Sequence, residues 1–320
     1  MIMNTLNPEI EFIGVTKVFR SGLFQKKAAV RDLSFAIPER EVVGILGANG
    51  SGKSTSLKML LGFLRPSSGE IRIHGGAPSD HRTRNKIGYL PENPRFQKFL
   101  TAEQILAYYG HLLEMGGKEL TKRIEFLLSL VGLNNAKKQR VAEFSKGMVQ
   151  RLAIAQSILH HPKILVFDEP MSGLDPIGRR EIRLLISQIK HEMDVTILFS
   201  SHILSDVEQL CGAVLLLNQG QLTRHCAVSE LLEGEPDNFR LVVKSIPDTI
   251  RLQLEPHQEE SQDSNHSILN LSGTNELREL LDLLALHGAT VVSVTSVRKS
   301  LEDSLFLEAK ENTDTEVPLL

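Results

Sequence analysis

The 320-residue sequence predicts an α/β fold built on a mixed sheet, and three stretches carry that prediction. The apolar run 42–46 is followed by a glycine-rich turn and then by leucines at helical spacing. Two further short runs, 164–167 and 195–199, are rich in apolar residues and are each followed at once by polar or charged ones. Such runs, alternating with helical patterns, are typical of strands buried in a largely parallel sheet.

The composition is that of a globular protein with enough apolar side chains for a core. Hydrophobic residues make up 41% of the sequence, charged residues 23%, and the formal net charge is -3. This charge does not favour nucleic acid, so we expect no such partner. No apolar run approaches the ~18 residues of a membrane span, and the amino-terminal residues do not resemble a signal peptide. Cys211 and Cys226 are far apart in sequence, which favours reduced cysteines in a cytoplasmic protein.

A phosphate-binding loop is the strongest local signal. It matches the pattern G-x-x-x-x-G-K-[ST] and consists of Gly47, Ala48, Asn49, Gly50, Ser51, Gly52, Lys53, Ser54 and Thr55. Glycines let backbone N–H groups point at an anion, and the helix that starts near Lys53 adds its positive end. We expect Lys53 to reach β- and γ-phosphates and the Ser54 hydroxyl to bind Mg²⁺. A chance match is the alternative, and the strand and helix on either side argue against it.

The region before this loop, residues 9–46, predicts an antiparallel start. Residues 32–37 alternate between polar and apolar, and Pro38 ends that run because proline cannot donate a ladder hydrogen bond. Phe19 lies upstream of the loop, where an aromatic ring can stack on an adenine. Core packing is the simpler explanation for one phenylalanine, and both interpretations stay open at this point.

A mostly helical insert is predicted between residues 95 and 160, after a strand at 87–90 and a proline-rich loop that contains Glu92. Apolar residues recur at helical spacing in 105–113 and in 120–131. The insert ends with Ser145, Lys146 and Gly147 at the start of another helix, for which Ser145 suits the N-cap. This combination indicates a second anion site, although capped helices are common.

Polar residues follow the two later strands at the edge where ligands bind in an open parallel sheet. Asp168 suits a Mg²⁺ ligand, and Glu169 suits a general base for a water that attacks a γ-phosphate. His202 is a candidate γ-phosphate sensor at the same edge. An exposed acidic loop is the alternative for the two carboxylates. Asp175 stands at the tip of a turn before a helix expected over 178–192, and a helix at 204–211 and a strand at 213–217 follow His202.

The carboxyl-terminal part predicts a separate α+β module over residues 239–310, after a linker at 234–238. Its expected elements are three strands, a helix over 275–287 and a short helix over 300–307. The last residues, 311–320, have the composition of a disordered tail. No residue of this module suggests chemistry.

In their order, these motifs resemble the ATP-binding subunit of ABC transporters over residues 9–233. The matches are Gly47–Thr55 to Walker A, Ile164–Glu169 to Walker B, Phe144–Met148 to the signature motif, Ser172–Pro176 to the D-loop, His202 to the switch histidine, Glu92 to the Q-loop position and Phe19 to the A-loop position. The resemblance favours the adenine interpretation of Phe19. It implies a P-loop NTPase cassette with a mixed sheet core, an antiparallel β subdomain and a helical subdomain, and it implies ATP and Mg²⁺. Lys53, Glu169 and His202 would be catalytic, and Ser54, Glu92 and Asp168 would bind the metal.

The resemblance also implies a working cycle. In this family the signature residues of one subunit meet the ATP held by the Walker A loop of another, so two cassettes close head to tail over two ATP molecules. Hydrolysis reopens them and moves membrane-embedded helices. We therefore expect an ATPase that forms a homodimer on a separate multi-spanning permease at the cytoplasmic face of the cell membrane. Residues 95–100 are the expected contact with the permease. Ser145, Lys146 and Gly147 of the signature motif would face the partner's nucleotide, and Asp175 of the D-loop is also expected to bind nucleotide.

Three residues differ from the commonest family pattern, and they indicate which group within the family the chain resembles. Lys146 stands where glycine is commonest, Met148 where glutamine is commonest, and Glu92 replaces the Q-loop glutamine. Lys146 adds a positive charge toward a phosphate, whereas Glu92 keeps a metal-binding oxygen but adds a negative charge near the γ-phosphate. These forms and the appended module resemble the ATPases of ABC-2-type systems, which are mostly exporters. An exporter is therefore expected over an importer.

Two other functions stay open. Soluble ABC ATPases that act on ribosomes or DNA usually carry two cassettes or a long coiled-coil insertion. This sequence has one Walker A motif, no heptad run and no basic tract. The other alternative is a cassette that binds ATP without hydrolysing it, and the presence of Glu169 and His202 argues against that function.

Overall fold

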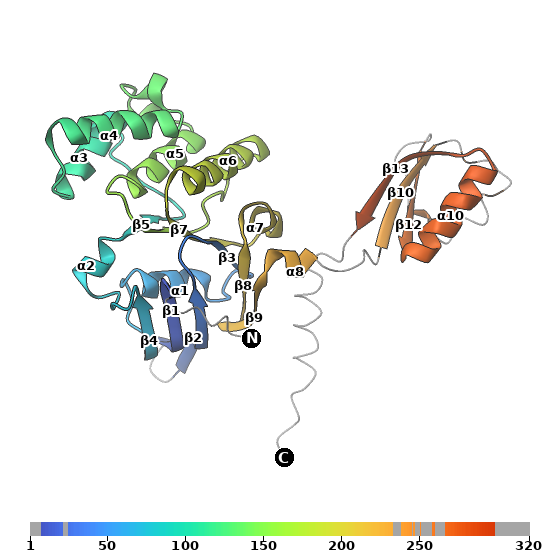
Figure 1. Cartoon of the computed structure of the whole chain (residues 1–320), viewed down its shortest axis with the longest axis horizontal. Coiled ribbons are helices and arrows are strands. Elements are labelled where there is room, and N and C mark those ends of the chain that lie inside the picture. Colours follow the sequence, from blue (N-terminus) through green and yellow to red (C-terminus); the bar gives the residue numbers. More distant parts are fainter. Residues whose placement is uncertain are drawn as a thin grey trace, which may run out of the picture. The chain divides into compact units, whose positions relative to one another are not determined.

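The computed structural model describes residues 8–21, 25–232, 238–244, 246, 250, 258–259 and 266–297. The chain divides into two compact units, Met1–Glu230 and Leu231–Leu320, whose elements are labelled in Figure 1. The helix expected over 300–307 and the tail 311–320 lie outside the described residues. In the described part of the chain, no helix is long and apolar enough to cross a bilayer.

A six-stranded sheet forms the centre of the first unit, in the order β5-β6-β7-β3-β8-β9. The strands are β3 (Val42–Leu46), β5 (Ile87–Leu90), β6 (Ile164–Phe167), β7 (Thr196–Ser201), β8 (Ala213–Asn218) and β9 (Gln221–Ala227). All pairs are parallel except β8 with β9. Every residue of β3, β6 and β7 is buried, as expected for strands covered on both faces. Because these three are neighbours, the residues that follow them meet at one edge.

The first unit also contains a three-stranded antiparallel sheet, in the order β2-β1-β4. Its strands are β1 (Ile10–Ser21), β2 (Gln25–Ile37) and β4 (Ser68–Ile73). Phe12 and Phe35 stack in its core with ring centroids 4.4 Å apart. Strands β1 and β2 are both longer than the alternating runs that the sequence shows. Register shifts between the two strands interrupt the alternation of side chains, but the strands remain paired.

Three helices, α3 (Ala102–Leu112), α4 (Gly117–Leu130) and α5 (Lys146–Ser157), form the insert between β5 and β6. In Figure 1 they gather on the side of the unit away from β1, β2 and β4. A capping box of Thr101 and Gln104 starts α3. The remaining helices of residues 8–232 are α1 (Lys53–Leu60), α2 (His81–Arg84), α6 (Pro176–Glu192), α7 (Leu204–Leu210), α8 (Val228–Leu232) and the 3₁₀ turns Asn134–Ala136 and Val141–Glu143.

Two elements of this unit differ from the sequence expectation. Helix α6 starts at Pro176 rather than at residue 178, because Asp175 accepts a hydrogen bond from the Gly178 N–H and proline suits the first helical position. Strand β9 was not expected, since its residues are mostly polar. A tight hairpin creates it: Gln219 and Gly220 both have positive φ, as the common two-residue hairpin turn requires.

The second unit contains a four-stranded antiparallel sheet, ordered β11-β12-β10-β13, and a helix. Its described elements are β10 (Asn238–Lys244), β11 (Gln258–Glu259), β12 (His266–Ser272), α10 (Thr274–Leu286) and β13 (Thr290–Val297). Leu241, Leu269 and Leu284 are fully buried in its core. Strand β11 is a fourth strand where the sequence predicts three, and it is only two residues long.

Candidate functional site

The glycine-rich loop 47–55 joins β3 to α1 at the carboxyl edge of the sheet. Gly50 and Gly52 have φ of 86° and 104°, in the left-handed region that glycine adopts without a steric penalty. Lys53 is the first residue of α1 and is 5% exposed. Its Nζ donates to the Gly47 carbonyl at 2.6 Å and to the Ala48 carbonyl at 3.3 Å. The loop therefore closes around the lysine ammonium.

Asp168, which follows β6, lies beside the Ser54 hydroxyl of α1. Ser54 Oγ donates to Asp168 Oδ1 at 3.3 Å, and Ser200 Oγ from β7 donates to the same oxygen at 2.7 Å. Mg²⁺ takes oxygen ligands at about 2.0–2.1 Å in octahedral geometry, so neighbouring ligands lie about 3 Å apart. The separation of Ser54 and Asp168 therefore fits two adjacent ligands of one Mg²⁺.

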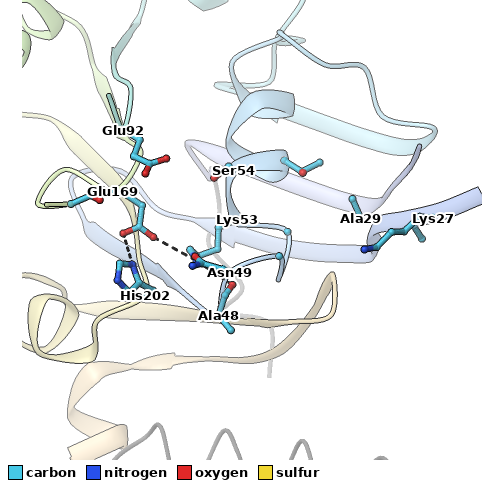
Figure 2. Close-up of a pocket in the computed structure, with 14 residues that line it drawn as sticks. Lys27, Ala29, Ala48, Asn49, Lys53, Ser54, Glu92, Glu169 and His202 are labelled. Carbon is cyan, nitrogen blue, oxygen red and sulfur yellow. Dashed lines mark hydrogen bonds and ion pairs between the residues drawn. The ribbon is translucent and has the colours of Figure 1, made fainter. Parts of the chain in front are cut away.

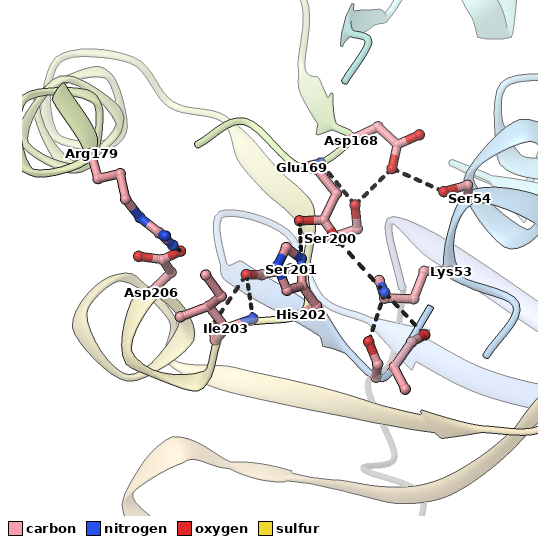
Figure 3. Close-up of polar contacts among 12 residues, drawn as sticks. Lys53, Ser54, Asp168, Glu169, Arg179, Ser200, Ser201, His202, Ile203 and Asp206 are labelled. Atoms are coloured by element: carbon pink, nitrogen blue, oxygen red, sulfur yellow. Dashed lines mark hydrogen bonds and ion pairs between the residues drawn. The ribbon is translucent and has the colours of Figure 1, made fainter. Parts of the chain in front are cut away.

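The Glu169 carboxylate is held from two directions, as Figure 3 shows. Its Oε2 accepts a hydrogen bond from His202 Nδ1 at 2.8 Å, and its Oε1 lies 3.6 Å from Lys53 Nζ. Glu169 has a φ of 49°, a left-handed conformation that costs a residue with a Cβ about 1–3 kcal/mol. Such strain persists only where neighbouring contacts hold it, and it is concentrated at functional sites.

Lys53, Ser54, Glu169 and His202 face one cavity of about 480 Å³, shown in Figure 2. This volume suits a small-molecule ligand. The lining residues are Lys27, Ala28, Ala29, Ala48, Asn49, Gly50, Gly52, Lys53, Ser54, Thr55, Glu92, Glu169, Ser172 and His202. Lysines and backbone amides together with carboxylates can hold a phosphorylated ligand and a divalent cation.

Phe19 lies next to this cavity without lining it. Its ring is 40% exposed, and in the β1–β2 register Phe19 pairs with Lys27, a lining residue. Lys17 Nζ lies 5.4 Å from the centre of the ring. An exposed aromatic residue paired with a lining residue is available for stacking, whereas a core role would have buried it.

The residues predicted to form the second anion site lie elsewhere. Ser145, Lys146, Gly147 and Asp175 are absent from the described lining of the cavity. Ser145 caps α5 by accepting from the Met148 N–H at 3.3 Å, and Asp175 caps α6 in the same way. The Lys146 ammonium lies against Gly173, where a Cβ would be 2.1 Å from Nζ. Within one chain, Ser145 and Asp175 have hydrogen-bond partners on their own helices, and none of the four residues is among those that line the cavity.

Comparisons with known proteins identify the family. A family model described as ABC transporter matches residues 30–172. The ABC transporter ATP-binding protein sll0415 of Synechocystis sp. is 37% identical over 306 residues, which cover 94% of this chain and 85% of the relative. The chain belongs to the ABC transporter ATP-binding proteins.

Two further matches extend this family assignment. The bacitracin transport ATP-binding protein BcrA of Bacillus licheniformis is 33% identical over 286 residues, covering 88% of this ABC protein and 92% of BcrA. A solved dimeric structure of the ATP-binding cassette MJ0796, in a post-hydrolysis state with ADP and Pi, has a TM-score of 0.61 and 25% identity, covering 68% of this chain and 98% of that one. The predicted ABC cassette fold is confirmed.

Carboxylates lie in and beside the cavity of this ABC protein. Glu92 and Glu169 line the cavity, and Asp168 lies behind Ser54. Burial raises the pKa of the nearby Tyr89 hydroxyl, and the charges of Asp168 and Glu92 raise it further. The same field would oppose a nucleotide phosphate, so a bound divalent cation suits this site.

The sequence did not reveal several residues of this ABC site. Strand β2 contributes Lys27, Ala28 and Ala29 to the cavity. A strand pattern in the sequence does not show which cavity its residues line. Ser200 bridges two site residues from within a buried strand. Its only sequence signal is its position shortly before His202, since the hydrogen-bond partners of a serine cannot be read from the sequence.

Proposed function

We propose that this chain hydrolyses ATP, with residues 9–233 as the ATP-binding domain. The main support for this proposal is that Lys53 and His202 both contact the Glu169 carboxylate at one cavity. Lys53 and the loop amides would bind the β- and γ-phosphates. Ser54 and Asp168, with Glu92 nearby, would hold Mg²⁺, which when bound offsets the phosphate charge. Phe19 and the β2 residues of the cavity would receive the adenine.

Glu169 acts as general base in this proposal. Both of its carboxylate oxygens are engaged in the free chain, one by Lys53 and one by His202. A γ-phosphate draws the Lys53 ammonium toward itself and so frees Glu169 Oε1. That oxygen takes the proton of a water as the water oxygen bonds to the γ-phosphorus and the bond to the β,γ-bridging oxygen breaks. His202 keeps the carboxylate oriented toward this water.

A second copy of the chain completes the site. Ser145 and Lys146 stand at the start of α5 and do not line the cavity of their own chain among the described residues. The amino-terminal end of α5 and the Lys146 ammonium favour a phosphate. A partner's ATP, in a head-to-tail homodimer, is the proposed recipient. The dimeric, nucleotide-bound state of the solved cassette supports this arrangement.

Complementation between two inactive variants tests the dimer and the hydrolysis together. Lys53→Ala disables the phosphate loop, and Ser145→Asp adds a repelling charge while keeping an N-cap residue. A mixed dimer has one site with both changes and one intact site. An equal mixture should therefore recover about a quarter of wild-type ATPase activity, because about half of the dimers are mixed.

A control mixture shows whether the recovery is specific. Lys53 and Glu169 both belong to the phosphate-loop half of the composite site. In a mixture of Lys53→Ala with Glu169→Gln, every site therefore contains a defective phosphate-loop half, and no activity should return. Equal recovery in both mixtures, or none in either, would contradict the composite site. A wild-type chain without ATPase activity would contradict hydrolysis itself.

The proposed partner is a multi-spanning permease, which places the chain at the cytoplasmic face of the cell membrane. BcrA is named for bacitracin transport, and the Ser145–Met148 and Leu90–Glu92 forms resemble ABC-2-type exporters. The expected contact, residues 95–100, contains Phe99, which is 71% exposed. An exposed aromatic near Glu92 suits an apolar helix of the permease. The module 239–310 is an accessory part of this proposal.

Affinity purification of the chain from gently solubilised native membranes tests the partner. Co-purification of a multi-spanning protein, lost in Phe99→Glu and retained in Phe126→Glu, would support the proposal. Phe126 is a matched control because it is also exposed, at 44%, on α4. Recovery with ribosomes or DNA-processing proteins instead would favour the soluble alternative.

A further inference from the structure

Ser200 is a buried hydroxyl that bridges two residues of the proposed hydrolysis site. Its side chain is 0% exposed on β7. Ser200 Oγ donates to Asp168 Oδ1 at 2.7 Å and accepts from the Glu169 N–H at 2.9 Å, as Figure 3 shows. The hydroxyl therefore touches the proposed metal ligand and the backbone of the proposed base at once.

The direction of both hydrogen bonds is fixed by chemistry. A backbone N–H can only donate, so the serine oxygen must accept there. The hydroxyl proton is then free to point at Asp168, whose Oδ1 accepts the hydrogen bond. Fully satisfied, such a buried bridge is rigid, whereas loss of the hydroxyl leaves a buried N–H without its partner.

The same segment holds Glu169 at its other end. His202, two residues after Ser200, contacts the Glu169 carboxylate at 2.8 Å. Glu169 is thus held at its N–H by Ser200 and at its side chain by His202. This double attachment explains how a glutamate stays at a φ of 49°, since strained backbone persists only where its surroundings fix it.

We propose that Ser200 is a positioning residue for ATP hydrolysis. It sets the direction of the Glu169 carboxylate toward the attacking water and holds Asp168 beside Ser54. It also ties both residues to the segment that carries His202. This inference rests on the proposed function. A purely structural serine would affect stability alone, and the experiment separates the two.

The test compares Ser200→Ala with Ser157→Ala, which removes another buried serine hydroxyl. Ser157 is 1% exposed and donates to the Ile154 carbonyl at 2.7 Å, at the far end of α5. For Ser200→Ala we expect kcat to fall about 10- to 100-fold, because partners one step from a metal or reacting group have effects of this size. The ATP Kd measured without Mg²⁺ should change less than about twofold, and the Mg²⁺ concentration for half-maximal nucleotide affinity should rise.

A double variant supplies the decisive readout. If Ser200 acts through Glu169, then Ser200→Ala should cause little further loss of kcat in a Glu169→Gln background. An equal fold-loss in both backgrounds together with an unchanged Mg²⁺ requirement, or the same fall of kcat in Ser157→Ala, would overturn the proposal. Ser200→Cys, which nearly keeps the shape but bonds weakly, carries the same expectation if the alanine variant does not fold. If the wild type hydrolyses ATP and Ser200→Ala has the same kcat, this inference is overturned and the proposed function is left intact.

Discussion

The two groups of residues assigned to the nucleotide differ in how completely one chain assembles them. On the phosphate-loop side, Lys53, the adjacent pair Asp168 and Glu169, and His202 come from three segments. Glu169 contacts His202 at 2.8 Å and Lys53 at 3.6 Å, and Ser200 bridges Asp168 and Glu169. On the signature side, Ser145 and Asp175 only cap their own helices.

The difference indicates which side of the proposed site is already assembled in a single chain. The phosphate-loop side is preorganised, since its groups already hold one another in place. On the signature side, Ser145 and Asp175 cap their helices but do not line the cavity among the described residues. This is expected of residues that contact a nucleotide held by a second chain. The first group should control binding and hydrolysis, and the second should control stability in an isolated chain.

The largest expected effect is that of Glu169→Gln. This change keeps the shape of the side chain but removes the base, so turnover should fall by about 10²-fold or more while ATP still binds. ATPase assays and a nucleotide titration measure the two quantities. The matched control is Glu125→Gln, on the exposed face of α4, which should change neither. Unchanged turnover in Glu169→Gln would show that Glu169 is not the general base.

The next effect is that of Lys53→Ala on ATP binding. A charge-assisted hydrogen bond contributes about 1.5–3 kcal/mol, so the Kd for ATP should rise roughly 10- to 100-fold. Lys58→Ala removes an exposed lysine of the same helix and should leave the Kd within about twofold. Normal ATP affinity in Lys53→Ala, measured by titration, would contradict the assigned role of the loop.

The smallest effect concerns Asp175→Ala on the signature side. Loss of the α6 N-cap should lower the free energy of unfolding by about 1 kcal/mol, or roughly 2–4 °C in Tm for a unit of this size. Asp175→Asn keeps a capping oxygen and should retain most of that stability. ATP affinity of the isolated chain should not change in either variant. A weaker affinity would show that this side already contacts nucleotide within one chain.

Local sequence patterns predicted much of the fold. Wholly apolar runs gave β3 and β6 because buried parallel strands leave little room for polar side chains. The cap residue Ser145 marked the start of α5 correctly. Strand β9 escaped prediction because its pairing depends on the Gln219–Gly220 turn and on a neighbour, and its own residues are mostly polar.

The phosphate loop, the carboxylate pair, the histidine and their order can all be read from the sequence, because each is a short pattern with its own chemistry. Which of these residues meet depends on the tertiary structure. Strand order places β7 between β6 and β3, and this neighbourhood brings Ser200 to Asp168 and Lys53 to Glu169. Ser145 and Lys146 stay away from that cavity. The physical reason is that contacts between distant segments depend on how strands pair and helices pack, and no local pattern encodes that pairing.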